Sequence, residues 1–171
     1  LPDLLKVAKK VIFDCHPRLV NLFKRSFPTV EVHGTRKQLN QLKWLDDVKP
    51  DASICVSRLA SLYRNSDADF PGKPFLQAPP EYGLGAGRGS RLRIGISWQG
   101  GTHQTRIDLR TIPLDQWLPI LSAAEADFFS LQYTPNAARE VCELEEKTGI
   151  HVRHYPGLVQ CDDYDVTAQF V

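Results

Sequence analysis

Two arginines, Arg106 and Arg110, lie in the polar loop that carries the strongest indication of chemistry in this sequence. The loop follows a short apolar run, begins with the pair Gly100-Gly101, and leads into a predicted helix. Glycine permits a sharp turn and a close approach of the backbone to a ligand. Arginine side chains and the free N–H groups of a helix start both bind phosphate oxygens. The segment 97–110 therefore predicts an anion-binding site.

The same loop has a plainer interpretation, in which its arginines pair with Asp108 and Asp115 on the protein surface. The spacing matches neither the P-loop nor the Rossmann glycine fingerprint. Trp98, at the end of the preceding strand, is either packed in the core or part of a ligand wall. From the residues alone, these alternatives stay open.

Gln132 and Tyr133 follow the next predicted strand, 127–131. In a parallel sheet the carboxyl ends of the strands lie at one edge, where ligands bind. Both side chains can hydrogen-bond a ligand there, although an ordinary loop explains them equally well.

His16 follows the first predicted strand and is a weak candidate for a general base. A base must lie near its substrate and have a suitable pKa, and the sequence reveals neither. His151 and His154 are three residues apart around a strand, so they lie on opposite faces and do not predict a shared metal. The acidic cluster 162–165 is explained more simply as the cap of a helix, so no metal site is predicted.

The composition is that of a folded globular protein: 171 residues, 42% of them hydrophobic and 24% charged. A formal net charge of +1 argues against binding to a nucleic-acid polymer. No apolar run approaches the roughly 20 residues that span a bilayer, and no signal peptide is recognisable. The four cysteines are widely spaced, which predicts mostly buried free thiols and a reducing, cytoplasmic location.

Apolar runs alternate with amphipathic helical patterns along the chain. Strands are expected at 11–13, 30–33, 52–56, 93–98, 127–131 and 151–154, and helices near 38–45, 114–124 and 136–148. The prolines and glycines of 71–91 predict an interdomain linker. We therefore expect an α/β protein with two Rossmann-like parallel-sheet domains, 1–70 and 92–171, both incomplete. The chain starts and stops within helical patterns and lacks Met, so we expect a piece of a longer protein.

A family resemblance adds to this pattern. The runs Ile94–Gly100, Arg110–Leu114 and Phe129–Gln132, with Arg106 between the first two, resemble glycosyltransferase family 9. That family includes the heptosyltransferases and, closer to this chain, tetratricopeptide-repeat proteins that carry such a transferase domain. The order of a basic residue, Ile, Pro and then a helix also looks like the donor domain of O-linked N-acetylglucosamine transferases. Further similar segments are Phe13–Val20, Pro74–Leu76 and Asp162–Ala168.

The resemblance implies a GT-B fold, with 1–70 on the acceptor side and 92–171 binding a nucleotide-diphosphate sugar. It implies transfer to a glycan, lipid-linked or protein acceptor without metal or cofactor, and possible neighbouring tetratricopeptide repeats. The donor diphosphate would contact five residues: Ser97, Gly100, Arg106, Arg110 and Gln132. Leu158 would lie in the loop near the nucleotide base.

In the family pattern the general base lies upstream of Leu1, and a further donor-binding segment follows Val171. We therefore expect this stretch alone to be inactive. Two alternatives remain: a transferase-like scaffold without turnover, and an unrelated two-lobed nucleotide binder.

Overall fold

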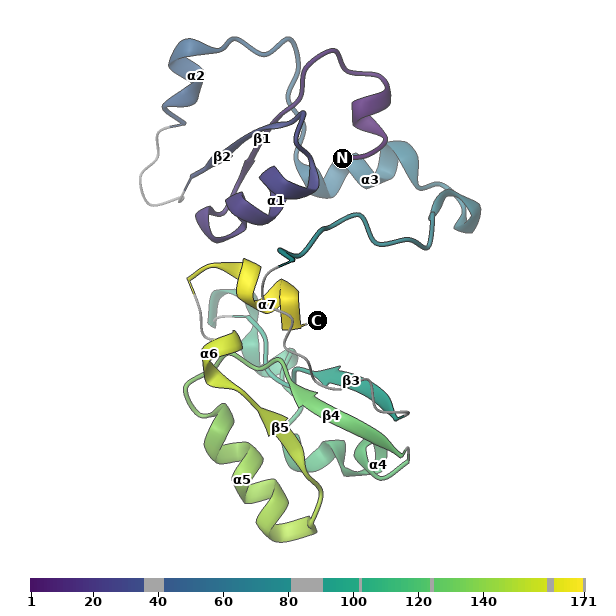
Figure 1. Ribbon diagram of the computed structural model, residues 1–171, viewed down its shortest axis with the longest axis vertical. Coiled ribbons are helices and arrows are strands. Elements are labelled where there is room, and N and C mark those ends of the chain that lie inside the picture. Colours follow the sequence, from purple (N-terminus) through teal and green to yellow (C-terminus); the bar gives the residue numbers. More distant parts are fainter. Residues whose placement is uncertain (36–41, 81–90, 102, 124, 160–161, 171) are drawn as a thin grey trace. The chain divides into compact units, whose positions relative to one another are not determined.

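The computed structural model describes residues 1–35, 42–80, 91–101, 103–123, 125–159 and 162–170. The chain divides into two compact units, which are described separately (Figure 1). The first unit combines Leu1–Glu81 with Asp163–Ala168, and the second combines Tyr82–Asp162 with Gln169–Val171. Residues 163–168 thus belong to the first unit, whereas the sequence analysis placed them in the second domain, 92–171. Residues 81–90 of the predicted linker, 71–91, lie outside the described residues.

The first unit is built on a two-stranded parallel sheet. Strand β1 (Ile12–Cys15) pairs with β2 (Glu31–Gly34), with Ile12 opposite Glu31 and Cys15 opposite Gly34. Helix α1 (Val20–Ser26) makes the crossover between them, as parallel pairing requires. It approaches β2 closely, since a β-carbon on Gly34 would lie 2.7 Å from the Val20 Cγ2 atom.

The core of the first unit includes residues of β1, β2 and α1. Its buried residues are Val11, Phe27, Val30 and Val32. Phe13 of β1 and Phe23 of α1 extend it, with ring centroids 4.6 Å apart. Such a small core is consistent with a sheet of only two strands.

The prediction of a strand at 52–56 is wrong. Residues 52–55 are loop, and helix α3 (Val56–Tyr63) begins at the end of the apolar run. Ile54 is 46% exposed and Val56 57% exposed, and the described residues provide no neighbouring strand to pair with them. A short apolar run forms a strand only where a partner strand supplies hydrogen bonds. The helix expected near 38–45 lies partly outside the described residues, and α2 is the short turn Trp44–Asp47.

The C-terminal helix α7 (Tyr164–Phe170) is fastened to α1 by charged side chains. The Arg25 guanidinium donates two hydrogen bonds to the Asp165 carboxylate. The Asn21 amide donates to the Asp163 carboxylate at 2.8 Å, and the Asp163 carboxylate also accepts the Asp165 N–H. These contacts join residues 163–168 to the rest of the first unit.

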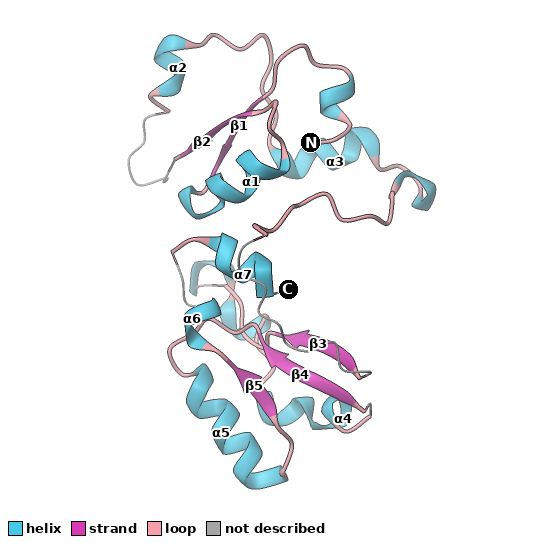
Figure 2. Ribbon diagram, in the orientation of Figure 1, coloured by secondary structure: helices cyan, strands magenta, loops and turns pink. Residues whose placement is uncertain are grey.

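The second unit contains a three-stranded parallel sheet (Figure 2). Its order is β3 (Leu92–Ile96), β4 (Ala126–Ser130) and β5 (Val152–His154), so β4 is central. The register places Ile94 opposite Phe128 and Phe128 opposite Val152. The mixed α/β class with all-parallel sheets is therefore confirmed, and its elements are consistent with Rossmann-like units.

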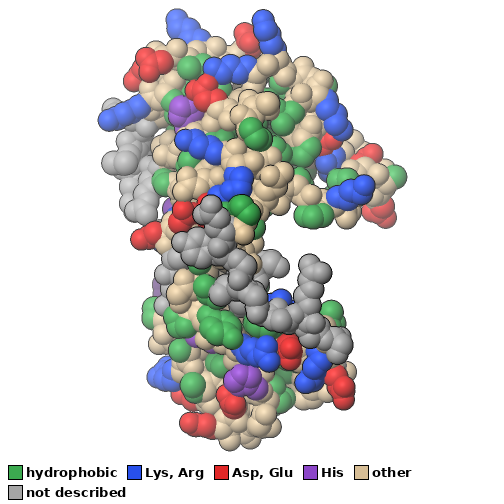
Figure 3. All heavy atoms as spheres, in the orientation of Figure 1, with side chains coloured by type: hydrophobic (Ala, Val, Ile, Leu, Met, Phe, Trp, Pro, Cys, Tyr) green, Lys and Arg blue, Asp and Glu red, His purple; other side chains and the backbone are tan. Residues whose placement is uncertain are grey.

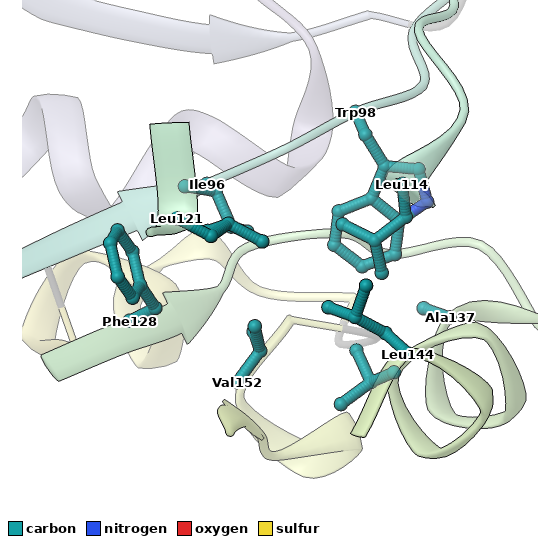
Figure 4. Packing of buried hydrophobic residues seen from close by; sticks show 9 residues of the cluster. Ile96, Trp98, Leu114, Leu121, Phe128, Ala137, Leu144 and Val152 are labelled. Carbon is teal, nitrogen blue, oxygen red and sulfur yellow. The ribbon is translucent and has the colours of Figure 1, made fainter. Parts of the chain in front are cut away.

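One face of this sheet carries the core of the second unit (Figure 4). Helix α5 (Ala137–Thr148) contributes Ala137, Val141 and Leu144, spaced as one helical face requires, and ends at Gly149 with a left-handed φ of 72°. The expected helix 114–124 is broken into a 3-10 turn, Leu114–Trp117, and the short α4, Leu118–Leu121. Another short helix, α6 (Pro156–Val159), follows β5.

The cysteines are only partly as expected. Cys15, Cys55 and Cys142 are free, but Cys55 and Cys142 are exposed, so the prediction of burial is wrong for these two. Cys142 lies in α5 between the buried residues Val141 and Leu144, a position that faces solvent. Residue 161, the fourth cysteine, lies outside the described residues.

Acidic and basic side chains are interspersed on the visible surface of each unit, in agreement with the small net charge (Figure 3). Among the helices that the structure describes, none has the length and apolarity needed to cross a bilayer.

Candidate functional site

The candidate site lies where the three parallel strands of the second unit end. The loop 97–110 leaves β3, Gln132 follows β4, and β5 ends at His154. In parallel sheets this edge is the usual place for a ligand, because the loops that follow the strands converge there. Sequence analysis placed its candidate residues at this edge, and the structure shows which contacts each side chain makes.

Gln132 is completely buried, with 0% of its surface exposed. Its Oε1 atom accepts hydrogen bonds from the Ser97 hydroxyl at 2.9 Å, the Trp98 N–H at 3.1 Å and the Gln99 N–H at 3.0 Å. Its Nε2 atom donates to the Gln99 carbonyl at 3.1 Å. All of these bonds go to the start of the loop, so Gln132 fastens the loop to the sheet.

Trp98 belongs to the core, which decides between the two interpretations of this residue. It is 3% exposed and packs within the main cluster of the second unit. Its indole N–H donates to the Glu140 carboxylate of α5 at 2.7 Å. The bond satisfies a polar group that burial would otherwise leave unpaired. Trp98 thus connects the loop to α5 and does not form a ligand wall.

The two glycines of the loop have different surroundings. A β-carbon on Gly100 would meet nothing within 4 Å, so the backbone here borders open space. Gly101 has a φ of 97°, and a β-carbon on it would lie 2.7 Å from the Thr105 Oγ1 atom and 3.3 Å from the Arg110 Nη1 atom. Only glycine fits at position 101 without strain. The tight turn brings the Arg110 side chain against Gly101.

Arg106 and Arg110 are both exposed. Arg106 has a left-handed φ of 59°, which is the only positive φ of a non-glycine residue in the described chain. In the described residues neither arginine forms an ion pair with Asp108 or Asp115, which were the partners expected for a purely structural loop. The two guanidinium groups are therefore available to an anion. A left-handed backbone at a non-glycine residue costs energy and concentrates at functional sites.

The far end of the loop is fixed as well. The Ile112 N–H donates to the Trp98 carbonyl at 3.0 Å, and the Thr111 hydroxyl donates to the Ile107 carbonyl at 2.8 Å. Trp98 begins the loop, and the bond from the Ile112 N–H to its carbonyl closes the loop. Arg110 lies two residues before Ile112.

His16 belongs to the first unit, where it starts the turn that precedes α1. Its Nδ1 atom accepts the Arg18 N–H at 3.3 Å. The capping role explains His16 without a catalytic one.

Leu158 and Tyr133 complete the candidates from sequence. Leu158 is half-buried in α6, and its N–H donates to the Tyr155 carbonyl at 2.9 Å. Tyr133 is 53% exposed and directly follows the buried Gln132. Nothing in the described contacts assigns either residue to a ligand.

Sequence analysis missed the pair Ser130 and His154. Ser130 is 0% exposed, its hydroxyl lies 2.9 Å from the His154 Nδ1 atom, and it accepts the Gln132 N–H at 3.3 Å. Burial lowers the pKa of His154. Their positions at the ends of adjacent predicted strands could have indicated this contact. His154 was weighed only as a metal ligand together with His151.

Asp14 was also missed. It lies in β1, and its Oδ1 atom is buried without a hydrogen-bond partner among the described residues. Such an atom is unusual in a folded protein. An acidic residue directly after an apolar run was the available signal.

Across the described residues, no group of His, Cys, Asp and Glu is arranged to hold a metal ion. Comparison with known proteins found no matching family model, no matching curated protein and no matching solved structure.

Proposed function

We propose that the second unit binds the diphosphate of a nucleotide-diphosphate sugar and that the chain is part of a cytoplasmic GT-B glycosyltransferase. One observation carries the proposal: the guanidinium groups of Arg106 and Arg110 are exposed on a loop whose two ends are fixed at the carboxyl edge of a parallel sheet. Two units, each with a parallel sheet, support the two-domain GT-B architecture.

The chemistry follows from where charge develops. In sugar transfer, the bond between the anomeric carbon and the diphosphate oxygen breaks, and a bond to the acceptor oxygen forms. The acceptor proton goes to a base, and the electron pair of the broken bond stays on the diphosphate. Arg110 and Arg106 meet that growing negative charge, so their attraction is larger in the transition state than in the bound donor. The open backbone at Gly100 lets a phosphate approach closely.

Calorimetric titration of the chain with pyrophosphate, uridine diphosphate and adenosine diphosphate tests the proposal. We expect Arg110→Ala and Arg106→Ala each to weaken binding about tenfold or more, because each removes a charge-assisted hydrogen bond. Arg139→Ala is the matched control, since Arg139 is an exposed arginine of the same unit that pairs within α5 with Glu143.

Equal affinities of wild type, Arg110→Ala and Arg139→Ala for all three probes would exclude the proposed site. If the diphosphates bind but a complete form of the protein neither transfers nor hydrolyses a nucleotide sugar, the scaffold alternative is supported.

A further inference from the structure

We propose that Gln132 is a positioning residue of the diphosphate site: its buried amide fixes the loop that holds Arg110 and makes no contact with the ligand. The inference rests on the proposed function and changes the role that resemblance implies for Gln132. It concerns how the loop is made rigid before any ligand arrives.

The burial of Gln132 argues against direct contact. None of its surface is exposed, so a phosphate oxygen has no access to its amide. The Oε1 atom already accepts from Ser97, Trp98 and Gln99. An amide oxygen has two lone pairs, so three donors exhaust its capacity.

The backbone at Gln132 is itself held by hydrogen bonds. Its backbone N–H donates to the Ser130 hydroxyl, and Ser130 is equally buried and bonded to His154. The neighbouring Leu131 N–H donates to the Ile96 carbonyl at 2.8 Å, which continues the pairing of β3 with β4. The amide of Gln132 is thus a rigid extension of the sheet.

A short path leads from this amide to the arginine. Gln99, held through both its N–H and its carbonyl, directly precedes the glycine pair. The Arg110 side chain packs against Gly101, since a β-carbon on Gly101 would lie 3.3 Å from the Arg110 Nη1 atom. The bond from Ile112 to Trp98 closes the loop from the other side. Releasing Gln99 and Trp98 therefore releases both supports of Arg110.

Gln132→Met tests the inference, because methionine has a similar size but neither accepts nor donates strong hydrogen bonds. We expect the amide hydrogens of Trp98 and Gln99 to exchange with solvent at least about tenfold faster in this variant, and pyrophosphate affinity to fall about tenfold. Ser97→Ala is the matched smaller change, since it removes one of the three donors and leaves both backbone bonds.

A double-mutant cycle separates positioning from contact. If Gln132 acts through Arg110, Gln132→Met costs little further affinity once Arg110 is already Ala. Additive losses would show an independent contact and overturn the inference.

Gln132→Glu provides a second test if the Met variant folds poorly. In the buried site the glutamic acid is held in its neutral form, so its carbonyl oxygen accepts from the three donors and its O–H donates to the Gln99 carbonyl as the amide does. Positioning therefore predicts a smaller loss of pyrophosphate affinity than in Gln132→Met. A direct contact predicts the opposite order, because the new negative charge would face the phosphate.

The two proposals can fail separately. If wild type binds none of the diphosphate probes, the proposed function falls and the role of Gln132 in it falls too. If wild type binds them while Gln132→Met has unchanged exchange and unchanged affinity, only the positioning role is overturned.

Discussion

The side chain of Arg110 packs over Gly101, with its Nη1 atom 3.3 Å from the position that a β-carbon of Gly101 would occupy. The same β-carbon would lie 2.7 Å from the Thr105 Oγ1 atom. Together with the φ of 97°, this crowding makes position 101 specific for glycine. The arginine and the turn beneath it therefore depend on each other.

Gly101→Ala is expected to disturb this arrangement. The alanine must leave its left-handed backbone or push Thr105 and Arg110 aside, so we expect a loss of about 1–2 kcal/mol in the free energy of unfolding and weaker pyrophosphate binding. Urea denaturation and calorimetry measure the two effects. Gly100→Ala is the stability control, because its β-carbon would meet nothing within 4 Å. Equal stability of both variants would contradict the interpretation.

His154 predicts a pH dependence of stability. Burial lowers its pKa in the folded protein below the ordinary value of about 6.5. Between these two pKa values the unfolded chain binds a proton that the folded protein does not, so stability falls as the pH decreases through that window. Above about pH 6.5 this effect is absent.

Urea denaturation between pH 5 and pH 7.5 measures the slope. His154→Asn places an amide near the former Nδ1 position and should flatten the profile, whereas His151→Asn, on an exposed residue paired with Glu145, should retain it. Parallel profiles for wild type and His154→Asn would show that another group controls the acid transition.

The exposed Cys55 thiol is expected to be the most reactive of the described cysteines. The Ser57 hydroxyl lies 3.1 Å from its sulfur, and hydrogen bonds from the Ser57 hydroxyl and backbone lower the pKa of the thiol. Burial raises the pKa of the Cys15 thiol. Because the thiolate is the nucleophile, iodoacetamide should label Cys55 first and Cys15 last.

Peptide mass spectrometry over time measures this order. Ser57→Ala should slow the labelling of Cys55 and leave Cys142 unchanged. An unaltered Cys55 rate would mean that the hydroxyl does not stabilise the thiolate.

The contact between Arg25 and Asp165 should hold the C-terminal helix on the first unit. Both side chains are mostly buried, with 27% and 15% of their surfaces exposed. Asp165→Asn removes the charge but retains the shape, and we expect a loss of about 1–2 kcal/mol in unfolding free energy. Limited proteolysis should also cleave near residue 164 sooner than in Asp51→Asn, which changes an exposed aspartate of the same unit. Identical cleavage rates would contradict a stabilising contact.

Much of the second unit could be predicted from the sequence, because its signals are local. The apolar spacing of Val141 and Leu144 and the glycine at 149 define α5 within its own length. The apolar residues of 127–131 likewise correspond to β4, with a shift of one residue at each end. Helix periodicity and a glycine cap act between residues a few positions apart, so neighbours in sequence are sufficient.

The sequence by itself determined the parallel α/β class and the types of residue at the strand ends, including the two arginines. Only the tertiary structure decided that 52–56 has no strand partner, that Trp98 is core, and that Gln132 bonds to the loop while Arg106 and Arg110 stay exposed. The physical reason is that hydrogen-bond partners and burial depend on segments far apart in the chain. A polar residue type alone is compatible both with a structural hydrogen bond and with ligand binding, and only the contacts in the folded chain distinguish the two.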